Sequence, residues 1–536
     1  MRPSKAAGFG LFVTRPPSQV MPALLALLAG VLQAASLAWP LGALEIPGLV
    51  GVARGQPVWW LQGLAMAGLV LLLLRCGSAR QAAWRGWLFA LAWLALTFGW
   101  LFTSMHTYGG LPAPLAVLAV LALAGVLALY YAAVCGLFRA LARTNRALTA
   151  ILFAALWLLA ELARGQWLTG FGWGAVGYAQ LDGPLASLIA WVGQYGVGFA
   201  VAVLAALLAQ VVWVRSWRDK LGAATGMLVL LATAQLVPPP DGATQGHLNV
   251  TLLQGNIAQD EKFEPGTGVP KALRWYGEQL QANRSSLVIS PETAVPLLPS
   301  QLPDGYWLAL QQRFASGEQA ALVGMPLGSY TEGYTNSVVG LKPGQPQPWR
   351  YDKHHLVPFG EFIPPLFRWF TDLMAIPLGD FNRGGLPQPT FDWQGQRLAT
   401  TICYENLFTE ELAAPFADPQ RAPTMLVNIS NLGWFGEHLA MDQHLQIARM
   451  RALEFERPFL LATNTGRTAI VNHRGEVTHT ATPHTATVLH GQVEGRSGLT
   501  PYARWLVQWG LWPLWGSAVV LVLFGAMIRQ QQPHRR

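Results

Sequence analysis

The stretch RLATTICYEN, residues 397–406, carries the pattern that decides the fold of the second half of this chain. Small and β-branched residues lead up to Cys403, and an acid-rich run, ENLFTEEL, follows it. This pattern predicts a strand that ends at Cys403 and a helix that begins there. A cysteine at such a junction would lie by the positive end of the helix dipole, which lowers the pKa of a thiol and favours the thiolate. The alternative is an inert, buried cysteine.

The alternation of short apolar runs with helical stretches extends over residues 246–500 and predicts an α/β domain of about 250 residues. A helix is expected at 444–458, where apolar residues recur at helical spacing before a proline, and a hairpin at 459–476. The remaining runs predict strands, some of which lead into helices, at 248–256, 286–296, 320–328, 335–341, 397–406 and 424–431. The chain contains no internal repeat.

Composition indicates that the rest of the chain lies in a membrane. The chain is 52% hydrophobic and 12% charged, whereas soluble proteins carry about 25% charged residues. Of the 28 acidic residues, five precede residue 246 and none follows residue 502. We therefore expect transmembrane helices in residues 1–245, the α/β domain in 246–500, and a last transmembrane helix with a tail in 501–536.

Eight apolar runs are long enough to span a bilayer, seven before the α/β domain and one after it. They are residues 21–39, 57–75, 86–104, 113–138, 148–164, 185–214, 221–238 and 505–528. Fifteen Lys and Arg residues lie in the termini and in alternate connections, and only Arg54 and Arg164 lie in the others. This bias predicts cytoplasmic termini and an α/β domain on the outer side. The first run could instead be a cleaved signal peptide.

Several other kinds of protein are disfavoured by the sequence. The net charge of +8 comes from short basic clusters between apolar runs, which is unlike the single basic face of a nucleic-acid-binding protein. The three cysteines show no CxxC spacing, and the histidines show no HExxH motif. These patterns predict neither a disulfide framework nor a metal site.

A cysteine nucleophile needs a base and a group that stabilises the oxyanion. Glu292 follows an apolar strand directly, where an unpaired carboxylate would be costly. Lys353 and Glu361 lie in the motif DKHHLVPFGE, and Glu405 follows the cysteine by two positions. Taken singly, each of these charged residues could be an ordinary surface residue.

The motifs resemble a known family once they are taken in order. The order Glu, Lys, Cys, in PET, DKHHLVPFGE and ICYE, is similar to the nitrilase superfamily. The wider set resembles the bacterial apolipoprotein N-acyltransferases, in the motifs QGNI at 254–257, NISNLGWFG at 428–436, QHLQIARMRALE at 443–454, RPFLLATNTG at 457–466 and ELARGQWLTGFGW at 161–173. The chain departs from the family's pattern at Leu432-Gly433, where Asp-Ala is more usual, and at Phe263, where a tryptophan would align.

The resemblance implies a two-step acyl transfer. Cys403 would attack the sn-1 ester of a phospholipid, typically phosphatidylethanolamine, and become a thioester. The α-amine of a lipoprotein's N-terminal diacylglyceryl cysteine would then take the acyl chain. Glu292 would be the base, and Lys353 with the backbone N–H of Tyr404 would hold the oxyanion. Glu361 and Glu405 would support these groups.

The resemblance also implies an architecture and a location. We expect a bundle of about eight transmembrane helices that carries a nitrilase-like α-β-β-α sandwich. The protein would be a monomer in the bacterial inner membrane, with the sandwich on the periplasmic side. It would need no cofactor and no metal, and it would bind no nucleic acid.

Aromatic residues near the motifs are candidates for substrate contacts. Phe263 and Trp434 belong to the expected substrate region. Residues 362–381, which include Trp369 and Phe370, are too interrupted to span a bilayer and are predicted either to pack into the core or to cover the site at the lipid surface.

Two other functions compete with acyl transfer. One is a membrane-anchored nitrilase-type amidase that acts on small amides, and the other is a transporter or scaffold with an inert domain.

Overall fold

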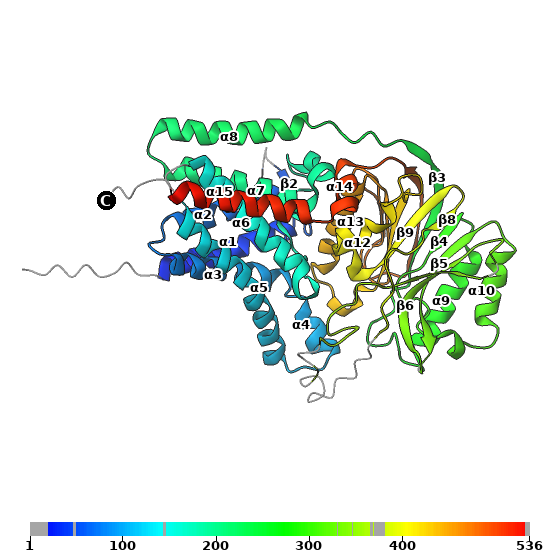
Figure 1. The fold of residues 1–536 in the computed structure, drawn as a ribbon. Coiled ribbons are helices and arrows are strands. Elements are labelled where there is room, and N and C mark those ends of the chain that lie inside the picture. Colours follow the sequence, from blue (N-terminus) through cyan, green and yellow to red (C-terminus); the bar gives the residue numbers. More distant parts are fainter. Residues whose placement is uncertain are drawn as a thin grey trace, which may run out of the picture.

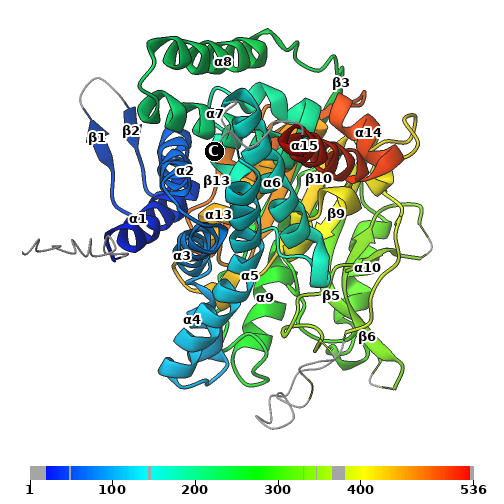
Figure 2. The same ribbon diagram turned by 60° about the vertical axis from the view of Figure 1, so that its left-hand side comes forward.

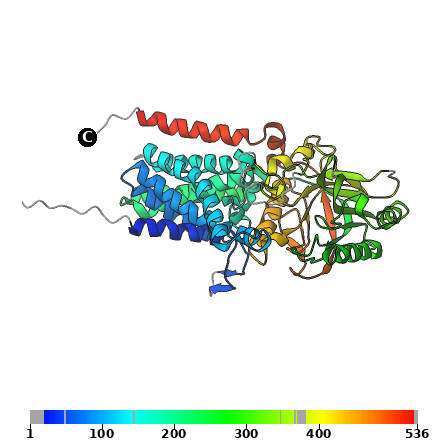
Figure 3. The same cartoon turned by 90° about the horizontal axis from the view of Figure 1, so that it is seen from below.

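The computed structural model describes residues 20–46, 50–142, 146–329, 331–345, 347–364, 368 and 381–530. It shows a helical bundle joined to an α/β sandwich, with the sandwich at one end of the bundle (Figure 1). Helix α1 (Val20–Leu37) begins, and helix α15 (Trp512–Gln530) ends, at the bundle end away from the sandwich (Figures 1 and 3). The start of α1 and the end of α15 thus lie at the same end of the bundle, and the side of the membrane on which each part lies stays a prediction.

The bundle contains a helix at each of the eight apolar runs. Its other elements are α2 (Trp59–Leu74), α3 (Ala79–Thr97), α4 (Leu101–Thr103), η1 (Ser104–Tyr108), α5 (Ala113–Leu141), α6 (Arg146–Gln166), α7 (Ile189–Trp213), α8 (Trp217–Leu236) and α14 (Pro501–Trp509). Between α1 and α2 a short hairpin, β1 (Leu44–Ile46) and β2 (Val50–Val52), projects from the bundle (Figures 2 and 3).

Within the described residues, four helices are long and apolar enough to cross a membrane, and two bent helix pairs would raise the number to six. The bent pairs are α3 with residues 101–108, at 61°, and α14 with α15, at 88°. Helix α2 has 16 residues, and α8 falls outside both groups. The structure thus supports a multi-span helical region, and the count of eight spans stays a prediction.

Two of the predicted spans differ from the helices that form. Helix α3 begins at Ala79, seven residues before the predicted span, because the Ser78 hydroxyl accepts a hydrogen bond from the Gln81 N–H and caps the helix. The last run breaks at Gly510, which has a φ of +55°. A glycine adopts this conformation readily, so the chain turns there instead of continuing as one helix.

The α/β domain is built on two six-stranded sheets, in the orders β13-β12-β11-β10-β9-β8 and β14-β3-β4-β5-β6-β7. The strands of the first sheet are β8 (Phe391–Trp393), β9 (Gln396–Ile402), β10 (Met425–Ser430), β11 (Phe459–Thr463), β12 (Ala469–Val471) and β13 (Val477–Thr480). Those of the second sheet are β3 (Thr244–Gln254), β4 (Leu287–Ile289), β5 (Ala320–Ser329), β6 (Gly333–Leu341), β7 (Trp349–Asp352) and β14 (Thr487–Arg496).

Strand β10 shows how the sheets pack. Alternate side chains point to opposite faces of a strand, so Val427 and Ile429 join the core between the two sheets while Leu426 faces away from it. Helices α9 (Gly268–Ala282) and α10 (Tyr306–Ala315) cover the outer face of one sheet. Helix α13 (Ala440–Phe455) covers the outer face of the other, toward the bundle (Figure 1). The order of layers is α-β-β-α, as the resemblance implies.

Helix α13 joins the sandwich to the bundle through buried polar contacts. The Glu454 carboxylate accepts hydrogen bonds from the Gln194 N–H at 2.8 Å and the Thr409 hydroxyl at 2.9 Å, and it pairs with Arg451 at 2.9 Å. Gln194 follows Gly193, which has a φ of +64° and where a Cβ would lie 2.3 Å from the Tyr502 ring. Only glycine fits at this position, which lets α7 bend to meet α13.

A second buried pair holds a bundle loop. The Arg164 guanidinium pairs with Glu161 at 3.3 Å and donates to the carbonyl oxygens of Phe171 and Trp173, at 2.6 and 2.8 Å. The hydroxyl of Tyr131 on α5 donates to Glu161. The pair therefore fixes the loop after α6. It is not a central intramembrane charge site of the kind that a transporter would carry.

We predict that Glu454→Ala destabilises the protein by about 3–5 kcal/mol, because it leaves the Arg451 guanidinium buried without its partner. Both side chains of this pair are fully buried. Urea unfolding in detergent, followed by tryptophan fluorescence, measures the change. Glu437→Ala is the matched control, since Glu437 is exposed and its loss should cost less than about 0.5 kcal/mol. Equal midpoints for the two variants would contradict the proposed docking contact.

Candidate active site

The ends of strands from both sheets meet at one edge of the sandwich. Cys403 follows β9, Glu292 lies three residues after β4, and Lys353 follows β7. Strand β9 runs parallel to β10, and β4 runs parallel to both β3 and β5. Parallel strands bring their carboxyl ends to the same edge, which explains why residues more than one hundred positions apart form one site.

The Lys353 ammonium lies between two carboxylates. Its Nζ is 2.8 Å from Glu361 Oε1 and 3.4 Å from Glu292 Oε1, and the lysine side chain is 1% exposed. Burial lowers the pKa of Lys353, but Glu361 and then Glu292 outweigh it, so the pKa lies above its usual value. The ammonium therefore stays charged throughout the pH range in which proteins function.

Asn336 is a member of the site that the sequence analysis missed. Its Nδ2 donates to Glu292 Oε1 at 2.6 Å and to Glu361 Oε1 at 2.9 Å. The backbone N–H of Asn431 donates to the other oxygen of Glu292, at 2.9 Å. These donors fix the orientation of both carboxylates. The only signal for Asn336 in the sequence is a polar residue inside the strand TNSVVGL, and such residues are common.

Cys403 occupies a strained backbone position. Its φ is +52°, in the left-handed region that non-glycine residues seldom adopt. The Asn428 side chain donates to the Cys403 carbonyl oxygen at 3.1 Å, which helps to hold this turn. The predicted helix begins as a 3-10 turn, Cys403–Leu407, and only its last part is a short α-helix, α12 (Thr409–Leu412).

The expected lowering of the Cys403 pKa is wrong. Burial raises the pKa of the thiol and the Glu292 carboxylate raises it further, while Lys353 and the backbone N–H of Tyr404 lower it less. A short 3-10 turn also has a weaker dipole than an α-helix. The surroundings of Cys403 therefore favour the neutral thiol over the thiolate.

Glu405 connects the cysteine turn to the loop that carries Lys353. Its carboxylate accepts hydrogen bonds from the Ile402, His354 and His355 N–H groups, at 2.6, 2.6 and 3.0 Å. The Tyr351 hydroxyl donates to it at 2.9 Å. Burial raises the pKa of Glu405 to about 7. The residue thus caps the turn after β9 and also ties it to the loop that carries Lys353.

Tyr404 contacts the bundle through its side chain. The buried ring lies near Phe171, with centroids 6.2 Å apart, and its hydroxyl donates to the Gly170 carbonyl oxygen at 2.8 Å. Since Arg164 holds the same loop, the bundle helps to fix the position of the Tyr404 backbone N–H.

Phe263 and Trp434 are partly exposed, at 50% and 40%. The Trp434 ring lies edge-on to the ring of Tyr108, the last residue of η1, with ring centroids 5.8 Å apart. Both residues stay candidates for substrate contacts. Trp369 and Phe370 lie outside the described residues, so the two alternatives for residues 362–381 stay predictions.

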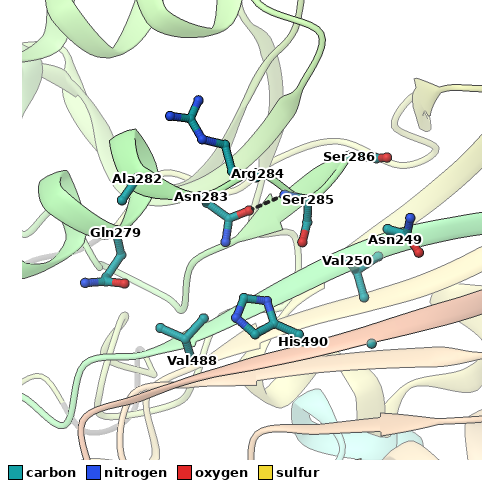
Figure 4. A pocket seen from close by; sticks show the side chains of 11 residues that line it. Asn249, Val250, Gln279, Ala282, Asn283, Arg284, Ser285, Ser286, Val488 and His490 are labelled. Atoms are coloured by element: carbon teal, nitrogen blue, oxygen red, sulfur yellow. Dashed lines mark hydrogen bonds between the residues drawn. The ribbon is translucent and has the colours of Figure 1, made fainter.

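A pocket of about 730 Å³ lies away from these residues, between the end of α9 and strands β3 and β14 (Figure 4). Asn283, Arg284 and His490 line it, and the Asn283 side chain accepts a hydrogen bond from the Ser285 N–H at 2.7 Å. In the described part of the chain, no group of three or more His, Cys, Asp or Glu residues could hold a metal ion.

Two family models match the chain. The apolipoprotein N-acyltransferase N-terminal domain matches residues 47–207, and carbon-nitrogen hydrolase matches residues 249–502. Among known proteins, an apolipoprotein N-acyltransferase of Verminephrobacter eiseniae is 56% identical and aligns over 91% of this chain and 92% of that protein. One of Ralstonia nicotianae is 42% identical over 88% of this chain and 90% of that protein. One of Bordetella bronchiseptica is 40% identical and aligns over 89% of this chain and 94% of that protein.

We predict that Asn336→Ala slows alkylation of Cys403 by a small uncharged reagent at pH 7 by about tenfold to a hundredfold, the usual value of a hydrogen bond to a charged group. Without these two hydrogen bonds, the Glu292 carboxylate is no longer held in the orientation in which it can accept the thiol proton. Asn336→Asp, which adds a third carboxylate at equal volume, should be slower still. Mass spectrometry of the peptide that holds Cys403 gives the rates.

Asn249→Ala is the control for this experiment, since Asn249 is exposed on the same domain and should leave the rate unchanged. Alkylation of Asn336→Ala at the wild-type rate would show that Asn336 does not orient the carboxylates.

Proposed function

The chain belongs to the apolipoprotein N-acyltransferase family, and from this we propose that it N-acylates lipoproteins through a thioester on Cys403. The observation that carries the mechanism is the placement of one thiol beside a buried Glu292–Lys353–Glu361 cluster, where the strands of both sheets end. A nucleophile, a base and a fixed cation are the parts that covalent acyl transfer requires.

In the first step, Cys403 Sγ forms a bond to the carbonyl carbon of the phospholipid sn-1 ester, and the thiol proton passes to Glu292. The negative charge that develops on the carbonyl oxygen is stabilised by the Lys353 ammonium and the Tyr404 N–H. The C–O bond of the ester then breaks, and Glu292 returns the proton to the glycerol oxygen. A lysophospholipid leaves, and the acyl chain remains as a thioester.

In the second step, the α-amine of a diacylglyceryl-cysteine lipoprotein attacks the thioester carbonyl. Glu292 accepts a proton from the amine, the C–S bond breaks, and the Cys403 sulfur regains a proton. The products are an amide and the free thiol, so the cycle is ping-pong. No cofactor enters either step, because the thioester retains the acyl-transfer potential of the ester.

The neutral resting thiol determines the order of proton transfer. Moving a proton from a thiol to a carboxylate costs about 6 kcal/mol at ordinary pKa values. Burial and Glu292 raise the pKa of Cys403 still further. A free thiolate is therefore too rare to be the attacking species, and the proton must move to Glu292 as the S–C bond forms.

The protein is a multi-span membrane protein, and we place it as a monomer in the bacterial inner membrane with eight spans, a periplasmic sandwich and cytoplasmic termini. The charge bias of the connections and the common end of α1 and α15 support this topology. The lipid substrates occupy the outer leaflet, so the site at the junction of bundle and sandwich can receive both. An amidase for small soluble amides would not need such a bundle.

We predict that Cys403→Ala folds and inserts but releases no lysophospholipid from vesicles of labelled phosphatidylethanolamine. Cys403→Ser should be almost inactive, because a hydroxyl is a far weaker acid than a thiol and Glu292 cannot deprotonate it. Cys76→Ala is the control, since Cys76 is buried in the bundle and should remain active. Release of lysophospholipid by Cys403→Ala at the wild-type rate would contradict the assignment of the nucleophile.

We predict that Lys353→Ala slows the first turnover by at least about 100-fold, the usual effect of removing an oxyanion donor. Lys353→Arg should not restore the rate, because a planar guanidinium does not fit where a compact ammonium contacts two carboxylates. Rapid-quench measurement of the first turnover gives the rates, and Lys342→Ala, a partly exposed site, is the control. An unchanged first turnover in Lys353→Ala would overturn the role.

A further inference from the structure

A second lysine, Lys262, lies buried against the site. The residue is 1% exposed, and its Nζ donates a hydrogen bond to the Glu292 carbonyl oxygen at 3.0 Å. No carboxylate of the described residues lies within ion-pair distance of this ammonium. Its other close contact is the Phe263 ring, 5.9 Å from Nζ to the ring centroid. An ammonium has three N–H donors, and within the described residues only one hydrogen-bond acceptor is found for this one, the Glu292 carbonyl oxygen.

Other buried cations of the sandwich are better satisfied. Lys353 contacts two carboxylates, and Arg451 pairs with Glu454. Arg457 donates to four carbonyl oxygens. A buried charge with a single neutral acceptor costs several kcal/mol, and an uncharged donor would make the same hydrogen bond at lower cost. A structural hydrogen bond alone therefore does not explain why this position carries a lysine.

The segment that carries Lys262 is rigidly held at the site. The Ile257 N–H and carbonyl both bond the side chain of Asn464, at 3.0 and 2.8 Å. Asn431, whose N–H holds Glu292, also donates its side chain to Gln259 at 2.7 Å. The hydrogen bonds that orient the Glu292 carboxylate thus continue into the segment that positions the ammonium.

We propose that Lys262 is a positioning residue of the reaction, a second buried cation beside Glu292 that favours negative charge at Cys403. This role rests on the proposed thioester chemistry. With Lys353 and Lys262 both charged, the two cations balance the carboxylates of Glu292 and Glu361. The balance persists when Glu292 takes the thiol proton and an equal negative charge appears on the substrate.

The electrostatics of Lys262 agree with this coupling. Burial lowers the pKa of Lys262 to about 7, while the charges of Glu292 and Cys403 raise it. Among the described residues, Glu292 and Cys403 are the ionisable groups whose charges act on Lys262. Because the coupling is reciprocal, negative charge at Cys403 draws a proton onto Lys262, and a charged Lys262 lowers the pKa of Cys403.

The pH dependence of Cys403 alkylation tests the charge without relying on acyl transfer. Full-length protein in detergent is treated with iodoacetamide between pH 6 and 10, and the peptide that holds Cys403 is quantified by mass spectrometry. Three variants separate charge from hydrogen bonding. Lys262→Gln keeps a donor without charge, Lys262→Met removes both, and Lys262→Arg keeps both. Lys271→Met is the matched control, because Lys271 is exposed on α9.

We expect Lys262→Gln and Lys262→Met to slow alkylation at pH 7 by about tenfold, the usual effect of one nearby charge. The difference from the wild type should narrow toward pH 10, where Lys262 of the wild type has lost its charge. Lys262→Arg should stay within about threefold of the wild type at pH 7, and Lys271→Met should match it. The first turnover with phospholipid should slow in the same order, with kcat affected more than KM.

An unchanged alkylation rate at pH 7 in Lys262→Gln, whatever its thermal stability, would show that Lys262 makes only a structural hydrogen bond and would overturn the proposal. If Lys262→Met fails to fold, the comparison of Gln with Arg still decides the question. If Lys262→Gln slows alkylation but the wild-type protein forms no thioester, the acyl-transfer mechanism is refuted and the electrostatic role of Lys262 remains.

Discussion

The contact between the Lys353 ammonium and the carboxylates of Glu292 and Glu361 is the interaction on which the site depends. Two carboxylates cannot share a buried space as anions unless a cation and hydrogen-bond donors lie between them. Lys353 and Asn336 supply these, at 2.6–3.4 Å. The cluster can be buried because each carboxylate oxygen of the two glutamates has a hydrogen-bond partner in the described part of the chain, and its charges act on the thiol of Cys403.

The rest of the fold buries this cluster and holds its residues in position. The two sheets bring strand ends from both halves of the domain to one edge, and Glu405 joins the cysteine turn to the loop of Lys353. The bundle takes part directly. Arg164 fixes the loop whose Gly170 carbonyl oxygen accepts the Tyr404 hydroxyl, and Glu454 fixes α13 to α7. Membrane helices and catalytic domain therefore form one structural unit around the thiol, as a reaction between two lipid-bound substrates requires.

The sequence predicted much of this arrangement, for identifiable reasons. Apolar runs that stop at charged residues mark strand ends, so PET and ICYE could be placed at the edge of a sheet before their neighbours were known. The membrane helices followed from hydropathy, apart from their ends. Those ends depend on local events, such as the Ser78 cap and the turn at Gly510, that a hydropathy window averages out. The direction in which the Cys403 pKa shifts was predicted wrongly, because it depends on burial and on Glu292, which lies 111 positions earlier in the chain. Asn336 and Lys262 were missed for a related reason, since a single polar residue in a strand or loop gives no pattern until the fold shows what it contacts.

A chase experiment shows whether Cys403 carries the acyl chain between the two substrates. Purified protein is incubated with phosphatidylethanolamine that bears a single labelled sn-1 chain, and its intact mass is followed after addition of a peptide with an N-terminal diacylglyceryl cysteine. The account predicts one acyl group on the peptide that contains Cys403, which disappears as the N-acylated product forms at the same rate. Product that forms without any acyl-protein, or an acyl group on another residue that turns over at the rate of the reaction, would contradict it.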